Sequence, residues 1–270
     1  MRKGYDDAHS SGLHAEIMPP VLSFASELAG LLSDFRRRLS PKSSHVSNTT
    51  RESCSRILPN HINEAFSEWG CVTKEKMASA LNFSPQATSY WSSRQRDRVF
   101  GANHDAFATK YTGFSACPPD YDNDIMYKSV LHAIRSVMVA ETPTATFLVL
   151  PNWANRSTSP YLSLVHANPE YCTCLGMIPQ TKLKYAKPTA WNGSPPTLST
   201  PTWSMNIIVA WNAAGREHLC AKSPDWLTHL RSAICAQAES AWRSSSTNNS
   251  TEQPHAPLVL PRKFNGKKDK

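Results

Sequence analysis

Apolar residues recur along much of the chain at the three- and four-residue spacing that places them on one face of a helix. Residues 21–39 show this pattern over about five turns, and residues 124–139 carry a broad apolar face. Asp122 or Asn123 can cap the second of these helices. The pattern predicts helices at residues 21–39, 62–69, 74–81, 124–139, 160–167 and 224–242.

Runs of consecutive apolar residues predict strands that are buried on both faces of a sheet. Such runs predict strands at residues 144–150 and 204–211 and a short strand at 113–116. Alternation of apolar and polar residues predicts a strand at 171–178, and residues 81–83 could form a further short strand. Residues 87–91 fit either a strand or a helical turn. Because strands and helices alternate from residue 81 to residue 212, we expect an α/β fold with a reduced, mostly parallel and Rossmann-like sheet.

Polar stretches divide the chain into four parts. Residues 1–20 are polar and end in two prolines, so we expect a loose leader. Residues 21–80 are expected to form a helical extension with a Ser/Thr-rich linker, and residues 81–242 the α/β domain. Residues 243–270 are rich in Ser, Asn, Pro and Lys, which predicts a disordered basic tail.

The net charge of +8 is concentrated at residues 36–38 and in the last residues of the chain. Such an excess favours a polyanionic partner, RNA or DNA, although soluble proteins with basic ends share this composition. The seven cysteines lack the spacing of a disulfide framework or a metal site. We therefore expect the nucleus or the cytoplasm rather than secretion. The longest apolar-rich stretch is too short and polar to span a bilayer, so we expect no membrane partner.

The segment from residue 111 to residue 125 is the most informative part of the sequence. It joins a short apolar run to a helix through a Cys-Pro-Pro-Asp turn at 117–120. Consecutive prolines have fixed φ, so they hold a turn rigid and direct carbonyl groups toward a substrate. A second strand ends in Pro-Asn-Trp at 151–153, and ligands of open α/β sheets bind beyond the carboxyl ends of strands. We expect both turns to line one crevice, with Trp153 either stacked on a base or packed in the core.

Two acidic residues flank a short Phe-Gly segment upstream of that turn. An acidic residue after the second strand of a Rossmann-like sheet often binds the ribose hydroxyls of a nucleoside cofactor. Asp97, Phe100, Gly101 and Asp105 are therefore candidate cofactor ligands, with a solvated surface carboxylate as the alternative for either aspartate. No G-x-G-x-x-G loop accompanies them.

Three blocks of the sequence together resemble the catalytic domain of the phosphorylated-CTD-interacting factor family. They are the Phe-Gly segment at 99–107, the Gly-Phe-Ser-Ala-Cys-Pro-Pro run at 113–119, and the strand that ends in Leu-Pro-Asn-Trp at 150–153. That family is similar to N6-adenine methyltransferases and modifies the cap-adjacent 2′-O-methyladenosine of mRNA. The resemblance implies a class I methyltransferase sheet, S-adenosylmethionine as cofactor and RNA as substrate. A partnership with the RNA polymerase II tail is implied by resemblance alone.

The resemblance also assigns roles to the turn at 117–120. The family's Asn-Pro-Pro-Phe motif falls on Cys117, Pro118, Pro119 and Asp120, where the Asn oxygen and the next carbonyl accept hydrogen bonds from the target amine. A thiol is a weak acceptor, and a carboxylate offers no face for a base to stack on. Tyr121 is the nearest aromatic residue, and together with Trp153 it is a candidate for contact with the substrate.

These departures leave three interpretations open. The first, which we place ahead of the others, is an S-adenosylmethionine-dependent RNA adenosine N6-methyltransferase with weakened or lost activity. The second is a non-catalytic nucleic-acid-binding protein that keeps the methyltransferase fold. The third is an inert remnant, for instance of a mobile element. Cys117 separates the first two, because an enzyme depends on the acceptor at that position and a binding protein does not.

Overall fold

The computed structural model describes residues 24–39, 60–80, 82–153, 159–183, 185–187, 197–201 and 203–234. The predicted leader, the Ser/Thr-rich linker and the predicted basic tail lie outside these residues. Within the described part, no helix is long and apolar enough to cross a membrane.

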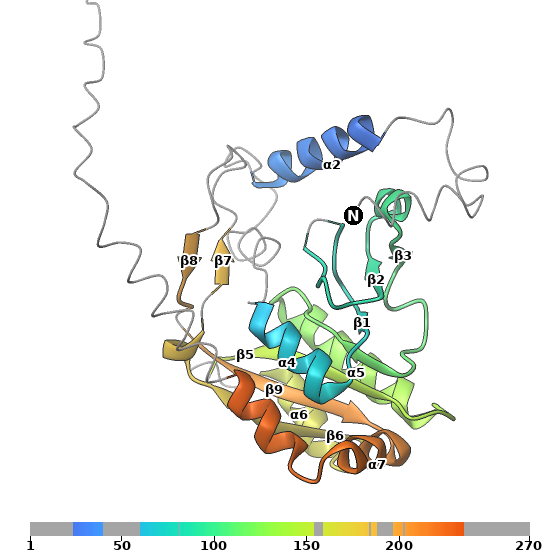
Figure 1. The fold of residues 1–270 in the computed structure, drawn as a ribbon, viewed down its shortest axis with the longest axis vertical. Helices are drawn as coiled ribbons and strands as arrows, with labels where there is room; N and C mark the ends of the chain where they lie inside the picture. Colours follow the sequence, from blue (N-terminus) through green and yellow to red (C-terminus); the bar gives the residue numbers. More distant parts are fainter. Residues whose placement is uncertain are drawn as a thin grey trace, which may run out of the picture.

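A seven-stranded sheet forms the centre of the molecule (Figure 1). Its strands are β1 (Lys74–Glu75), β2 (Ser89–Ser92), β3 (Asn103–His104), β4 (Phe114–Ala116), β5 (Ala145–Asn152), β6 (Cys172–Ile178) and β9 (Ser204–Trp211). They lie in the order β3-β2-β1-β4-β5-β9-β6. Neighbouring strands are parallel from β3 to β5, whereas β9 runs antiparallel to both β5 and β6. The predicted Rossmann-like, mostly parallel sheet is confirmed, and the four longer predicted strands all lie in it.

Helices cover both faces of this sheet. They are α2 (Phe24–Leu39), α4 (Asn60–Gly70), α5 (Asn123–Met138), α6 (Pro160–Ala167), α7 (Ala213–Lys222) and a further helix at residues 226–234. Short 3₁₀ helices η1 (Gln95–Phe100) and η2 (Gln180–Lys182) follow β2 and β6, and β7 (Tyr185–Lys187) pairs with β8 (Thr197–Ser199) in a separate hairpin. Helix α5 begins where the sequence predicted, because Asp122 accepts hydrogen bonds from the N–H groups of Asp124 and Ile125.

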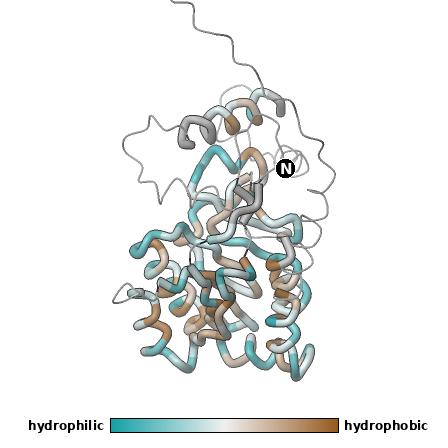
Figure 2. Tube along the Cα trace, turned by 90° about the vertical axis from the view of Figure 1, so that its left-hand side faces the viewer, coloured by the Kyte–Doolittle hydropathy of each residue, from teal (hydrophilic) through white to brown (hydrophobic). Residues whose placement is uncertain are grey.

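The long strands contribute to a hydrophobic cluster on each side of the sheet. Phe147 and Val149 of β5 pack under α4, α7 and the helix at 226–234, whereas Leu148 and Leu150 pack under α5 and α6. A strand covered on both sides needs apolar residues at most positions, which explains the apolar run from Phe147 to Leu150. Figure 2 shows the same arrangement, with hydrophobic segments inside the sheet-and-helix part and hydrophilic segments around it.

A third cluster joins α2 to the β2 side of the sheet. Leu31 of α2 is 1% exposed and packs against apolar residues of β2, η1 and the loop after β1. Glu27, which is fully buried, pairs with Arg96 of η1 at 3.4 Å. Gly30 makes room for this pairing, because a Cβ atom there would collide with the Arg96 guanidinium. Helix α2 is therefore docked on the segment that connects β2 to β3.

The prediction of a helix at residues 74–81 is wrong. Lys74 and Glu75 form β1, which pairs with β2 on one side and β4 on the other. Tertiary pairing from both sides overrides a local preference for helix. The strand predicted at 81–83 is also wrong for the two residues described there: the N–H groups of Asn82 and Phe83 donate to the Ser79 carbonyl in a turn. The open choice at 87–91 falls to a strand, β2.

The elements just before residue 81, where the sequence predicted a domain boundary, pack with the elements that follow it. Helix α4 and β1 belong to the sheet and its core, so residues 60–80 are continuous with the α/β domain. The interval from residue 81 to 117 is short for three strands and their crossovers. It suffices because β1 lies before it, β2 and β3 have only four and two residues, and η1 alone fills the β2–β3 crossover.

Candidate ligand-binding cavity

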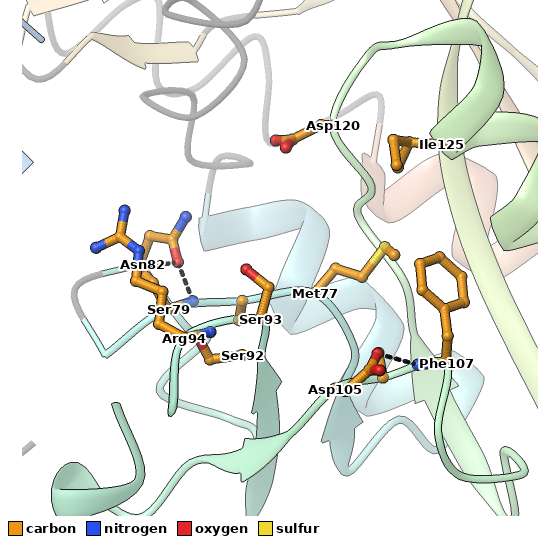
Figure 3. Close-up of a pocket in the computed structure, with 12 residues that line it drawn as sticks. Met77, Ser79, Asn82, Ser92, Ser93, Arg94, Asp105, Phe107, Asp120 and Ile125 are labelled. Carbon is orange, nitrogen blue, oxygen red and sulfur yellow. Dashed lines mark hydrogen bonds between the residues drawn. The ribbon is translucent and has the colours of Figure 1, made fainter. Parts of the chain in front are cut away.

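A cavity of about 280 Å³ lies at the carboxyl ends of the parallel strands β1 to β4. Its volume is near the lower end of the roughly 300–1,000 Å³ that ligand sites occupy. It is lined by Met77, Ala78, Ser79, Asn82, Ser92, Ser93, Arg94, Asp105, Ala106, Phe107, Asp120 and Ile125 (Figure 3). Ligands of open α/β sheets bind at this edge, so the fold itself points to this cavity.

The loop after β1 forms one wall of the cavity. The Ala78 N–H donates to the Trp91 carbonyl of β2 at 2.8 Å, which holds the two strand ends together. Ser79 donates from its N–H and from its hydroxyl to Oδ1 of Asn82, at 2.6 and 2.8 Å. Met77 has a φ of +63°, a left-handed conformation that is usually left to glycine. The loop thus makes a tight turn at the cavity without the glycine-rich sequence that usually marks a nucleotide site.

Asp105, on the loop after β3, forms the facing wall. Its N–H donates to the Ser92 carbonyl at 3.0 Å, and its Oδ1 accepts from the Phe107 N–H at 2.9 Å (Figure 3). Its φ is +47°, so this backbone is also left-handed. Of the three non-glycine residues with positive φ in the described part of the chain, Met77 and Asp105 line the cavity. Residues with such backbone conformations are often found at ligand sites, where the surrounding structure fixes them.

Asp97 lies behind the cavity wall rather than in it. The side chain is fully buried, and its Oδ2 accepts from the Ala80 N–H at 3.2 Å and from the Ser92 hydroxyl at 2.8 Å. Asp97 therefore ties the loop after β1 to the end of β2. Phe100 is 1% exposed in the third cluster, and Gly101 closes η1 with a left-handed φ of +86°. The structure gives these three residues supporting contacts and none of them lines the cavity.

Three charged side chains line the cavity: Asp105, Asp120 and Arg94. In Figure 3, Asp120 and Ile125 come from the segment around the start of α5, and Arg94 lies on the far side beside Asn82. Their charges sum to one negative charge. The cavity therefore offers carboxylate acceptors on two walls, a guanidinium on a third and serine hydroxyls between them.

Cys117 is fully buried and does not line the cavity. Its Sγ lies 3.9 Å from the Tyr111 hydroxyl, and burial raises the pKa of the thiol to about 12. At neutral pH the group is therefore an uncharged thiol beneath the cavity. Pro119 is buried and Pro118 half-buried beside it, and neither lines the cavity.

Two charged residues at the end of β1 are buried next to this thiol. Burial raises the pKa of Glu75 to about 7, even though the Ser84 N–H donates to its Oε2. Lys76 is 1% exposed, and burial lowers its pKa to about 7. Its Nζ lies 2.8 Å from the centre of the Trp91 ring and 4.9 Å from that of Tyr111. An amine with its charge held only by aromatic rings is costly to protonate in the interior.

The two predicted substrate residues, Tyr121 and Trp153, do not line the cavity. Tyr121 is half-buried between the two main clusters, and Trp153 packs near Trp203, with the ring centres 6.4 Å apart. The structure thus brings together only Asp105 and Asp120 of the candidate residues. Their roles as ligands stay predictions.

Sequence reasoning missed most of the cavity lining. Ser79, Asn82, Ser93 and Arg94 are polar residues on loops and Ser92 ends the short β2, so no hydrophobic periodicity marks them. The signal that could have found them is the position of β1: once residues 74–75 are read as a strand, the residues that follow belong to a carboxyl-end loop.

No protein-family model matches the sequence, and no curated protein matches it. Among solved structures, the chain is similar to the crystal structure of a S-adenosylmethionine-dependent methyltransferase from Clostridium acetobutylicum ATCC 824. The identity is 10%, the TM-score is 0.24, and the match covers 77% of this chain and 87% of that chain. A similarity with so low a TM-score does not indicate the function of this chain. In the described residues, no three His, Cys, Asp or Glu side chains form a group that could hold a metal ion.

Two features define the fold class of the chain. One strand is reversed inside an otherwise parallel sheet, and a cavity lies at the carboxyl ends of the parallel strands. The chain has a Rossmann-like α/β fold.

Proposed function

We propose that the chain binds S-adenosylmethionine in the cavity at the ends of β1 to β4. The observation that carries this proposal is the cavity's position on the sheet together with its charged lining. S-adenosylmethionine carries a sulfonium, an ammonium and a carboxylate, and so has one net positive charge. Two carboxylates and one guanidinium, Asp105, Asp120 and Arg94, match that pattern with one net negative charge. Serine hydroxyls and Asn82 suit the ribose and the adenine edge.

When bound, S-adenosylmethionine supplies a methyl group activated by the sulfonium. The chain's own residues hold the two reactants in line and keep water out. Asp105 is held in place by two backbone hydrogen bonds, so its carboxylate is preorganised toward the cavity. Phe107 and Ile125 supply apolar walls between the charged groups.

We propose further that the chain is an RNA adenosine N6-methyltransferase-like protein with weak methyl transfer. The RNA substrate, its cap-adjacent adenosine and a nuclear location rest on the sequence resemblance at residues 99–107, 113–119 and 150–153. The weak transfer follows from Cys117, because an uncharged buried thiol cannot hold an amine as an amide oxygen does. Losing one such preorganised group typically costs about 100- to 1,000-fold in rate.

The alternative is a nucleic-acid-binding protein that keeps the fold and has no catalysis. The burial of Cys117 favours this alternative, because the thiol does not line the cavity and so does not face a target amine there. The two functions share the cavity and differ in chemistry.

Calorimetry of the purified full chain with S-adenosylmethionine tests the first proposal. We expect a dissociation constant in the micromolar range and weaker binding of adenosine 5′-monophosphate, which adds negative charge beside two carboxylates. No heat of binding at millimolar cofactor would overturn the assignment of the cavity. A radiolabel assay on capped and uncapped A-rich RNA then separates the two functions. Cofactor binding without transfer to any RNA would favour the non-catalytic alternative.

A further inference from the structure

A row of basic side chains leads away from the mouth of the cavity along α5. Lys128, His132 and Arg135 occupy positions i, i+4 and i+7 of the helix, which place them on one face. Lys128 and Arg135 are exposed and His132 is half-buried. The row begins at the cavity, because the Lys128 ammonium lies 4.2 Å from the ring centre of Phe107, a cavity-lining residue.

The loop that follows β3 runs beside this face of α5 and adds a fourth basic side chain. The Thr109 carbonyl lies 2.9 Å from Nε2 of His132, and the Tyr111 N–H donates to the Ser136 hydroxyl at 3.0 Å. Lys110 lies between these two anchors and is exposed. The loop therefore holds Lys110 next to the second half of α5. We call Phe107, Lys110, Lys128, His132 and Arg135 the basic strip.

The charges of the basic strip are available to a partner. Among the described residues, Lys110, Lys128 and Arg135 have no carboxylate within ion-pair distance. Asp124 stands four residues before Lys128 on α5, yet no ion pair joins them. Cations that have no acidic partner on the protein attract a polyanion, and the attraction grows as each phosphate contact releases counterions.

Aromatic rings lie among these cations. The His132 ring meets Phe107 edge-on at 5.6 Å and Tyr111 at 4.6 Å between ring centres, so the half-buried Phe107 ring is held in one orientation. The Lys128 ammonium covers the ring face that a base would take. A flexible lysine can move from that face to a phosphate when a base stacks there. A ring that is fixed at the cavity mouth next to cations suits a base and its phosphate better than it suits an acidic peptide.

We propose that the basic strip is the path of a single-stranded nucleic acid that delivers a base to the mouth of the cavity. This inference rests on the proposed function. From Lys128 to Arg135 the helix rises about 10 Å at about 1.5 Å per residue, the length of about three phosphates of a stacked strand. The strand must be single, because a base inside a duplex cannot enter a cavity without leaving its stack.

The test measures the binding of a fluorescein-labelled, A-rich, 12-nucleotide single-stranded RNA to the full chain by fluorescence anisotropy at several salt concentrations. The test variant is Lys128→Glu with Arg135→Glu. The control is Arg216→Glu with Lys222→Glu on α7, two exposed cations on the opposite face of the sheet that undergo the same change of charge.

We expect the strip variant to bind the RNA at least about tenfold more weakly than the control. Its salt dependence should fall by about 1.4 in the slope of log K against log salt, because each lost contact with a single strand removes about 0.7. Equal weakening in both variants would mean that net charge alone attracts the RNA, and would overturn the strip. Thermal melting checks folding, and Lys128→Gln with Arg135→Gln gives the same comparison if the charge reversals unfold the protein.

Two further measurements identify the occupant and separate this inference from the proposed function. If polyglutamate displaces the RNA from the strip as efficiently as unlabelled RNA does, the strip is a site for an acidic protein and the nucleic-acid proposal fails. Calorimetry with S-adenosylmethionine should give the same affinity in both charge variants. RNA binding through the strip without cofactor binding would remove the proposed function and leave the strip. Cofactor binding with an unchanged RNA affinity in the strip variant would support the proposed function and overturn the strip.

Discussion

Single side chains decide the charge of the cavity. Asp120 is the residue whose presence was least expected there, because the resemblance places an aromatic residue at its position. In the structure it lines the cavity opposite Asp105. A carboxylate at this position is a poor stacking surface for a base but a good partner for a cation. The residue that disfavours catalysis by the family's route therefore favours a positively charged ligand.

Replacing Asp120 by Asn should separate two cofactor forms that differ by one charge. S-adenosylmethionine has a sulfonium that S-adenosylhomocysteine lacks. Losing a hydrogen bond or contact to a charged group costs about 1.5 kcal/mol, so Asp120→Asn should bind S-adenosylmethionine about tenfold more weakly. Binding of S-adenosylhomocysteine should change much less. Calorimetry with both ligands measures this, and Asp124→Asn, an exposed carboxylate outside the cavity, is the control. An equal loss for both ligands would place Asp120 away from the sulfonium.

Lys76 should give the protein an unusual dependence of stability on pH. Its pKa in the folded protein is about 7, below the usual 10.5, because burial disfavours the ammonium. Between these values the unfolded chain binds more protons, so the free energy of unfolding rises with pH, by at most about 1.4 kcal/mol per pH unit. Glu75 has the opposite sign, but its effect lies mainly below pH 7. Lys76→Met should lack the rise between pH 7 and pH 9.

Urea unfolding at several pH values, with wild type and Lys76→Met side by side, checks this expectation. The variant should also be the more stable protein at pH 6, where the wild type must bury a charged amine. Parallel pH profiles for the two proteins would show that the Lys76 amine is not the titrating group.

At the scale of elements, length decided what the sequence could predict. The eight-residue strands β5 and β9 and the sixteen-residue α5 have enough positions to show their period, and all three were predicted. Strand β1 has two residues and was predicted as helix, because only its pairing with β2 and β4 defines it. Helix α7 was missed since only Gly215 and Leu219 of its ten residues are buried. Most of the cavity lining was missed for the same reason as β1, because it lies on the loops that follow the short strands β1, β2 and β3.

The start of α7 offers a test of how tightly elements pack. A Cβ atom on Gly215 would collide with the backbone carbonyl of Thr144, just before β5, and backbone cannot move aside as a side chain can. Gly215→Ala should therefore destabilise the protein by about 2–3 kcal/mol, despite the better helix propensity of alanine. Gly113→Ala is the comparison: its φ is +70°, but the nearest atom is the flexible Lys74 Nζ at 3.4 Å, so about 1 kcal/mol is expected. Chemical denaturation would contradict this ranking if Gly113→Ala were the more damaging change.

At the scale of the whole molecule, the three hydrophobic clusters support different parts of it. The two large clusters hold helices on the faces of the sheet, and the second also reaches the cavity through Ala106, while the third packs α2 against the loop after β1. Ala78 belongs both to the third cluster and to the cavity lining. Helix α2, which the sequence could place only as an amphipathic helix in an extension, contributes Leu31 to this cluster. No local pattern could show which surface α2 would cover.

Because of this division, two equal losses of core packing should have different effects on the cavity. Leu31→Ala and Leu219→Ala each remove a side chain that is at most 1% exposed, and each should cost about 2–5 kcal/mol of stability. Only Leu31 supports the loop after β1, where the Ala78 N–H donates to Trp91 and the Ala80 N–H donates to Asp97. Leu31→Ala should therefore speed hydrogen exchange at these two amides beyond the change in global stability, whereas Leu219→Ala should not. It should also weaken S-adenosylmethionine binding by about 1 kcal/mol, roughly fivefold, at temperatures where both variants are folded. If both variants show the same exchange at Ala78 and Ala80 after correction for their global stabilities, α2 covers the sheet without shaping the cavity.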